Sequence, residues 1–172
     1  MSTTIRPWTE TDRQAVIDLI LPIQQQEFGI DISLQDQPDL IDVPGTYHCG
    51  AGQFWVAVDA DSQEIIGSIA LIEGTPLPDG KRMGILRKMF VRQDHRGRSD
   101  KAQTSLADRL MATLLAHGKA QGLDLVVLGT TGVMRAAQQF YRRQGFDALS
   151  ADDLPENFPR MSCDSMFFQK TF

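Results

Sequence analysis

The hydrophobic pattern of the first thirty residues predicts a short strand followed by a helix. The strand covers residues 4–8, and Thr9 and Asp12 then stand at the spacing of a helix-capping box. Apolar residues next recur at intervals of three and four, as they do on one face of a helix: Ala15, Val16, Leu19, Ile20 and Ile23. The pattern predicts a helix over residues 10–29, with a kink at Pro22 because proline removes a backbone donor.

Strand-forming runs dominate the next part of the chain. Residues 31–52 are rich in turn formers and predict little regular structure beyond a helical turn at 37–41, so we expect a mobile, substrate-facing segment there. Residues 54–58 and 65–72 then form two apolar runs joined by a polar turn, which predicts an antiparallel hairpin. A third run over 83–91 predicts another strand.

The second half of the chain alternates helices with strands. Helical periodicity covers residues 105–121 and 133–143, and the apolar stretch 125–128 between them predicts a strand covered on both faces. A helix that connects two strands implies that they are parallel neighbours. Residues 146–149 and 161–170 supply two more strands. The sequence therefore predicts an α/β fold with a mixed sheet.

A basic loop whose residues could bind a ligand lies between the third strand and the following helix. Residues 92–104 include Arg96, Gly97, Arg98 and Lys101, and the helix begins directly after them. Unpaired amides and the helix dipole both favour an anion at such a turn. The loop predicts a phosphate site, although a merely solvated basic turn would have a similar composition.

The order of these elements, together with several short motifs, resembles the GCN5-related N-acetyltransferase (GNAT) superfamily. Residues 86–91 followed by Asp-His-Arg-Gly-Arg at 94–98 are similar to its acetyl-CoA motif. Residues 137–141 and Gly-Phe at 145–146 are similar to its closing signature. The resemblance covers nearly the whole chain, including the opening Ile-Arg-Pro at 5–7.

This resemblance implies a fold and an activity. The expected fold is a single domain over residues 1–172, with about six to seven strands flanked by about four helices and with strands splayed at the acyl-CoA site. The implied activity is direct transfer of an acetyl group from acetyl-CoA to an amine of a small molecule, in preference to a protein. A longer acyl group, a hydroxyl acceptor and a catalytically silent acyl-CoA sensor are the alternatives.

The resemblance also assigns residues that contact the cofactor. A backbone amide of the strand over residues 83–91 is expected to polarise the thioester carbonyl. The basic loop and the start of the following helix are expected to hold the pyrophosphate. Met134 occupies the position of the Asn that usually binds pantetheine, so Thr131 or its neighbour Thr130 is expected to make this contact instead. The expected cofactor-binding residues are Met89, Phe90, Val91, Arg96, Gly97, Arg98, Ser105, Leu106, Ala107 and Thr131.

Two catalytic roles follow from the same resemblance and from the chemistry of acyl transfer. Tyr141 matches the frequent general acid that protonates the departing thiolate, with simple packing against the sheet as its alternative. Glu73 is the carboxylate nearest the expected position of the general base, with a solvated strand-end charge as the alternative. Glu27 or a chain of water molecules would serve equally.

Two features depart from the family pattern or extend it. The second glycine of the loop is missing and the loop is longer, which places the chain in a subset with an elongated pyrophosphate loop. In addition, Arg87 and Lys88 interrupt an apolar strand. A bulge there would turn one of them into the acceptor cleft and favour an acceptor with a carboxylate or phosphate, whereas the simpler alternative is a solvated rim charge.

The composition of the chain narrows the classes of ligand and of structural support that we expect. The 172 residues carry a net charge of −5, so the whole-molecule field disfavours nucleic acid and anionic lipid. The two cysteines, Cys49 and Cys163, have no metal-ligand spacing and predict neither a disulfide framework nor a metal site. We expect a cytoplasmic protein without a membrane segment, and its sheet edges make a homodimer plausible.

Overall fold

The computed structural model describes residues 2–97 and 104–172, and in these residues seven strands form one mixed sheet in the order β1-β2-β3-β4-β5-β7-β6. The first four strands pair antiparallel with their chain neighbours, and β5 then joins parallel to β4. The strands are β1 (Thr3–Pro7), β2 (Gln53–Asp59), β3 (Ile65–Glu73), β4 (Met83–Val91), β5 (Leu125–Thr130), β6 (Asp147–Leu149) and β7 (Met166–Thr171).

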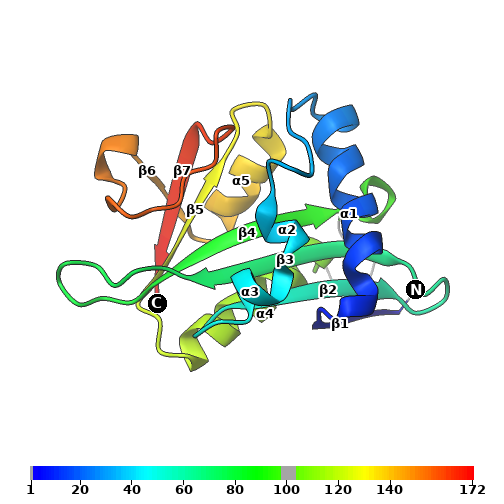
Figure 1. Ribbon diagram of the computed structural model, residues 1–172, viewed down its shortest axis with the longest axis horizontal. Helices are drawn as coiled ribbons and strands as arrows, with labels where there is room; N and C mark the ends of the chain where they lie inside the picture. Colours follow the sequence, from blue (N-terminus) through cyan, green and yellow to red (C-terminus); the bar gives the residue numbers. More distant parts are fainter. Residues whose placement is uncertain (1, 98–103) are drawn as a thin grey trace.

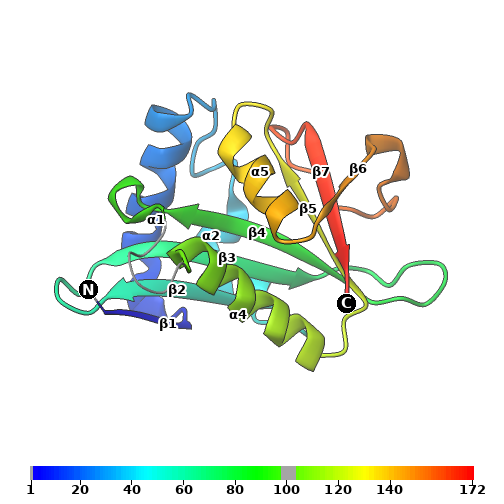
Figure 2. The same ribbon diagram turned by 180° about the vertical axis from the view of Figure 1, so that it is seen from behind.

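Helices cover both faces of this sheet. In Figure 1, α1 (Arg13–Pro22), α2 (Pro38–Ile41) and α3 (Val43–Tyr47) lie in front of the sheet, and Figure 2 shows α4 (Leu106–Ala120) and α5 (Arg135–Arg143) on the opposite face. A short π-helical segment, Ile23–Glu27, continues α1. Within the described residues, no helix is both long and apolar enough to cross a bilayer.

The core follows this layering. One apolar cluster packs α4 and α5 against the sheet through side chains such as Leu110, Met111 and Phe168. A second cluster packs α1 to α3 on the other face and includes Tyr47 and Phe54. Both faces of the central strands are therefore buried, as their nearly continuous apolar runs require.

Most of the predicted elements are confirmed. The hairpin, the third strand, the helix over 105–121 and the parallel pairing of the 83–91 and 125–128 runs are all present. The segment 31–52 was predicted to be largely irregular, but it contains α3 as well as the expected turn at α2. The last strand begins only at Met166 because residues 161–165 form a turn.

Pro22 marks a change in helix type. The α-helix ends at this residue and the backbone continues with π-helical hydrogen bonding over Ile23–Glu27. A proline lacks the donor that the regular ladder needs, so the predicted disturbance at this position is confirmed.

Glu73 is the last residue of β3 and is held there by hydrogen bonds from two other segments. Its Oε1 accepts hydrogen bonds from Arg82 Nε at 3.0 Å and Nη2 at 2.8 Å, and its Oε2 accepts the Ala51 amide at 2.7 Å. The Ala51 amide and the Arg82 guanidinium lower the pKa of this carboxyl group. Glu73 therefore joins the start of β2 to the loop before β4, and this structural role accounts for its contacts.

Replacing Glu73 with Gln should lower the free energy of unfolding by about 1 kcal/mol near neutral pH, since charge-assisted hydrogen bonds to Arg82 are lost. Because its pKa is lowered in the folded protein, the ionised form stabilises the protein above the unfolded pKa, and this contribution disappears as the pH falls through the folded pKa. Denaturant titrations at pH 7 and pH 3 should therefore show a larger difference between variant and parent at pH 7 than at pH 3.

The matched control is Glu64→Gln, which removes a more exposed carboxylate that pairs with Arg92 at the opposite end of the same hairpin. This change should alter stability by less than about 0.5 kcal/mol. An equal loss in both variants would contradict the structural role given to Glu73.

Candidate active site

A bulge in β4 shapes the site. Arg87 pairs with Ala70 and Phe90 pairs with Ser68, so Lys88 and Met89 together stand opposite Ile69 alone. Lys88 adopts a φ of 53°, a left-handed conformation that is uncommon for a residue other than glycine. Such a bulge bends a strand and redirects its side chains. The bulge expected near Arg87 and Lys88 is thus present.

Beyond the point at which they pair, β4 and β5 diverge. They are paired only from Met83 with Leu125 to Ile85 with Val127, and β4 continues beside β3 as far as Val91. The divergence is visible as a widening gap between the two strands in Figure 1. The strand splay that the resemblance implied is confirmed.

The divergence leaves backbone amides of β4 without a strand partner. The Arg92 amide donates to Ile66 O on β3, and Val91 O faces the other way, where it accepts Arg96 Nε at 2.7 Å. Because backbone direction alternates along a strand, we infer that the amides of Met89 and Val91 point into the gap and that of Phe90 points toward β3.

A cluster of buried charges lies behind the bulge. Lys88 is 6% exposed, and its Nζ lies 2.6 Å from Gln37 Oε1 and 3.3 Å from Asp39 Oδ2. Arg87 Nη1 lies 3.8 Å from the same Asp39 oxygen, to which the buried Tyr47 hydroxyl also donates. Burial lowers the pKa of Lys88, while Asp39 opposes this effect. Neither cation is therefore the solvated rim charge of the alternative interpretation.

A cleft of about 450 Å³, hereafter the larger cleft, opens where α4 and α5 face the end of β4. Of the residues expected to bind the cofactor, those that line it are Met89, Phe90, Val91, Arg96, Gly97, Ser105 and Ala107. Leu106 does not line it but packs against the core. Arg98 and the rest of the elongated loop up to residue 103 lie outside the described residues.

The N-terminus of α4 faces the larger cleft. Ser105 and Asp108 form a capping box in which the Ser105 hydroxyl accepts the Asp108 amide at 3.1 Å and the Asp108 carboxylate accepts the Ser105 amide at 2.8 Å. This box fixes the direction of the helix axis and of its positive end. Ser105 and Ala107 thus line the cleft where an anion is favoured.

Arg96 already has protein partners on this cleft. Its guanidinium forms a two-pronged ion pair with Glu27, in which Nη2 lies 2.9 Å from Oε2, and its Nε donates to Val91 O. Glu27, which was considered as an alternative base, is thereby paired with a cation. The contact joins the π-helical segment to the basic loop across the mouth of the gap.

A second cavity of about 90 Å³, hereafter the smaller cleft, lies on the other side of the gap. It is bounded by the bulge of β4, the end of β5 and the segment that precedes β7. Thr131, expected on the cofactor, lines this cleft rather than the larger one. Its Oγ1 is buried and has no hydrogen-bond partner among the described residues. A buried hydroxyl without a partner is costly unless a ligand or water satisfies it.

Asp164 is a residue of the smaller cleft that the sequence did not single out. It lies in the turn before β7, and its Oδ2 accepts the Met161 amide at 3.0 Å. Burial raises the pKa of this carboxyl group, although Arg87, Arg160 and Lys88 act in the opposite direction. A lone aspartate in a polar turn has no sequence signal that would have identified it.

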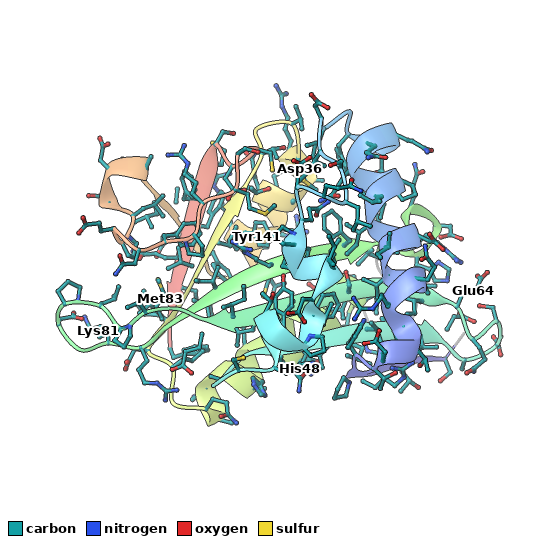
Figure 3. The ribbon with its side chains drawn as sticks, in the orientation of Figure 1. Asp36, His48, Glu64, Lys81, Met83 and Tyr141 are labelled. Atoms are coloured by element: carbon teal, nitrogen blue, oxygen red, sulfur yellow. The ribbon has the colours of Figure 1, made fainter. Side chains whose placement is uncertain are left out.

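Tyr141 lies where the two clefts meet, and it lines both of them. Its ring packs against Phe140, Phe146 and Phe168, and Figure 3 places it beside the diverging strands. Burial, together with the nearby Asp164, raises the pKa of its phenol, so the group keeps its proton at neutral pH. No described residue donates to or accepts from its hydroxyl.

Glu73, in contrast, lines neither cleft. It lies opposite Gly84, at the end of β3 remote from the bulge, where Arg82 and the Ala51 amide hold its carboxylate. This position does not support the role of general base, and it fits the alternative of a strand-end charge, here with a defined partner.

Comparisons with known proteins agree with this geometry. The acetyltransferase (GNAT) domain family model matches residues 50–148. N-acetyltransferase 8F1 of Rattus norvegicus is 29% identical over 108 residues, which cover 63% of this chain and 45% of the relative. A probable N-acetyltransferase, camello, of Xenopus tropicalis is 28% identical over 68% of this chain and 49% of its own. The chain thus spans less than half the length of these two relatives.

Solved structures match over the full length. An acetyltransferase of the GNAT family from Staphylococcus aureus superposes with a TM-score of 0.88 and 32% identity over 99% of both chains. A phosphinothricin acetyltransferase from Sinorhizobium meliloti, in complex with acetyl-CoA, superposes with a TM-score of 0.72 and 14% identity over all of this chain and 89% of its own. With the splayed strands and the matched domain, these likenesses establish that the chain belongs to the GNAT acetyltransferase family.

Proposed function

We propose that the protein transfers an acetyl group from acetyl-CoA to the amine of a small molecule. The observation that carries this proposal is the position of Tyr141, whose side chain lines both clefts at their junction. In this reading the larger cleft takes the acyl donor, the smaller cleft takes the acceptor, and the acyl group is transferred beside the tyrosine.

Three features support acetyl-CoA as the donor. The larger cleft combines the unpaired amides of β4, the positive end of α4 and the guanidinium of Arg96. Extended amides suit a pantetheine arm that pairs like an added strand, and the helix end suits a pyrophosphate. The Sinorhizobium protein of the same fold holds acetyl-CoA.

The residues of the junction divide the chemistry between them. The amides of Met89 and Val91 donate toward the gap, where they would stabilise the negative charge that develops on the thioester oxygen when the amine nitrogen attacks the carbonyl carbon. As the carbon–sulfur bond breaks, Tyr141 gives its proton to the sulfur. The proton that the amine nitrogen loses as the amide forms restores the Tyr141 phenol, so the products are an amide and the free thiol of CoA.

The size of the smaller cleft supports a small acceptor. At about 90 Å³ it is smaller than the roughly 150 Å³ cavity that admits a benzene molecule. Phe158 and Pro159 form part of its wall, where Arg87 Nη2 donates to Pro159 O at 2.6 Å. A small amine fits a cavity of this size better than a folded protein surface does.

Replacing Tyr141 with Phe should lower kcat by about 100-fold while leaving acetyl-CoA affinity and thermal stability nearly unchanged. The ring packing is kept, and the hydroxyl has no partner among the described residues to lose. Thiol release from acetyl-CoA with a panel of amines measures the rate, and calorimetry measures binding.

Glu73→Gln is the control for this experiment, and it should leave kcat at the parent value. Acetyl-CoA binding without turnover of any amine, and with no effect of Tyr141→Phe, would instead favour the silent sensor.

Replacing Arg96 with Gln should weaken CoA binding about tenfold and leave the binding of pantetheine, which lacks phosphate, unchanged. Arg92→Gln is the matched control, because Arg92 belongs to the same loop but pairs with Glu64 and Asp94 and lines neither cleft. Calorimetry with both ligands gives the comparison. Equal losses for CoA and pantetheine would contradict a phosphate contact.

A further inference from the structure

The smaller cleft contains charged groups that the proposed transfer chemistry does not use. We propose that it selects an amine that also carries a carboxylate, with the amine group beside Asp164 and the carboxylate beside Arg87. This inference rests on the proposed function and names the class of acceptor. It comes from the balance of charge around the cavity, from one unbonded carboxylate oxygen and from one unpartnered hydroxyl.

The charges around the cleft do not cancel. Arg87 and Lys88 line it, and among the described residues both lie within 4.0 Å of one carboxylate only, that of Asp39. Arg160 acts on Asp164 from outside the cleft lining. The two lining cations thus share the single carboxylate of Asp39, which leaves one positive charge that the carboxylate of a ligand would balance, while Asp164 faces its ammonium group.

Arg87 has donors left for such a ligand. One Nη2 hydrogen is used on Pro159 O, Nη1 is 3.8 Å from Asp39, beyond a normal hydrogen bond, and the guanidinium also interacts with the Tyr47 hydroxyl. A guanidinium has five N–H groups in a planar fork that fits a carboxylate. With its side chain 17% exposed, Arg87 is screened from bulk water, and a charge-assisted contact there is strong.

Asp164 has a carboxylate oxygen that is available to bind the amine group. Its Oδ2 is held by the Met161 amide, while no described residue bonds its Oδ1. Gly129 on β5 makes room for the carboxylate, because a Cβ at that position would lie 2.5 Å from Asp164 Oδ2. The charged groups that face this carboxylate are Arg87 and Lys88 from β4 and Arg160 from its own segment, and the neutral titratable groups are Tyr141 from α5 and Cys163.

The position of Asp164 suits proton removal from the acceptor. A bound ammonium must give up one proton before its nitrogen attacks, and Asp164 Oδ1 would accept it. The nitrogen loses a second proton as the amide forms, and this proton replaces the one that Tyr141 gives to the sulfur. Burial makes this carboxylate a stronger base than an exposed one. The Thr131 hydroxyl, buried on the same cleft without a partner, would bond to the acceptor as well.

Matched acceptor pairs test the carboxylate contact. Each pair contains an amino acid and its carboxamide, for example β-alanine and β-alaninamide, and thiol release gives kcat/KM for both. The parent protein should prefer the carboxylate by roughly tenfold or more in at least one pair. Arg87→Gln should remove this preference, whereas Arg160→Gln, which removes a cation from outside the cleft lining, should keep it.

A second variant tests Asp164 independently. Asp164→Asn should lower kcat/KM about 100-fold at pH 7 for both members of a pair. The deficit should shrink as the pH rises toward the pKa of the free amine, since a neutral amine needs no base. A merely structural change would lower the rate equally at every pH, and acetyl-CoA calorimetry on each variant confirms that the fold is intact.

The outcomes separate this inference from the proposed function. Turnover of amines with no preference for the carboxylate, or an Arg87→Gln variant that keeps the preference, overturns the inference and leaves acetyl transfer in place. Binding of acetyl-CoA without turnover of any amine overturns both.

Discussion

The ion pair between Lys88 and Asp39 anchors the bend in β4 on which both clefts depend. A lysine at 6% exposure is costly unless a carboxylate and hydrogen bonds compensate for the lost water, and Asp39 and Gln37 provide them. Removal of one partner from such a pair typically costs about 3–5 kcal/mol. The four-residue helix α2 therefore acts through its position, because it holds Asp39 against the bulge.

The bend has a direct chemical consequence. Once β4 turns away from β5, the amides of Met89 and Val91 have no strand partner, and the two clefts share lining residues such as Met89 and Tyr141 at this gap. Three aromatic neighbours pack against the Tyr141 ring at this junction and fix its orientation. Burial and the nearby Asp164 raise the pKa of its phenol still further above neutral pH, so the hydroxyl is a proton donor there.

The sequence predicted the parts of the molecule in which local pattern and tertiary structure agree. Strands β2 to β5 and helix α4 have strong periodicity, and the tertiary contacts follow it. Helix α3 was not predicted, because Pro44 and Gly45 normally interrupt a helix, whereas here proline stands in the first turn and the Asp42 side chain accepts the Gly45 amide. Contacts between segments that are distant in the sequence could not be predicted from the local pattern of residues.

Because local pattern does not predict long-range contacts, some of the predicted site residues lie at the gap and others do not. The family motifs placed Tyr141 and the β4 amides on the gap, since both belong to regular elements. Glu73 was a candidate because it ends the strand that precedes the expected position of the base, but its partner Arg82 comes from the loop before β4 and holds it away from both clefts.

Asp164, in contrast, was not singled out from the sequence although it lines the smaller cleft. Gly129, 35 positions earlier in the chain, leaves room for its carboxylate, and the pairing of β5 with β7 brings the two residues together. The larger cleft, which we propose for the acyl donor, is built on the sheet, whereas the smaller cleft, which we propose for the acceptor, takes its charges from the bulge and from the turn before β7. On this proposal, changes in that turn would alter which amine binds without disturbing the strands at the larger cleft. Although the chain has a net charge of −5, the proposed choice of acceptor then depends on a few local charges rather than on the overall field.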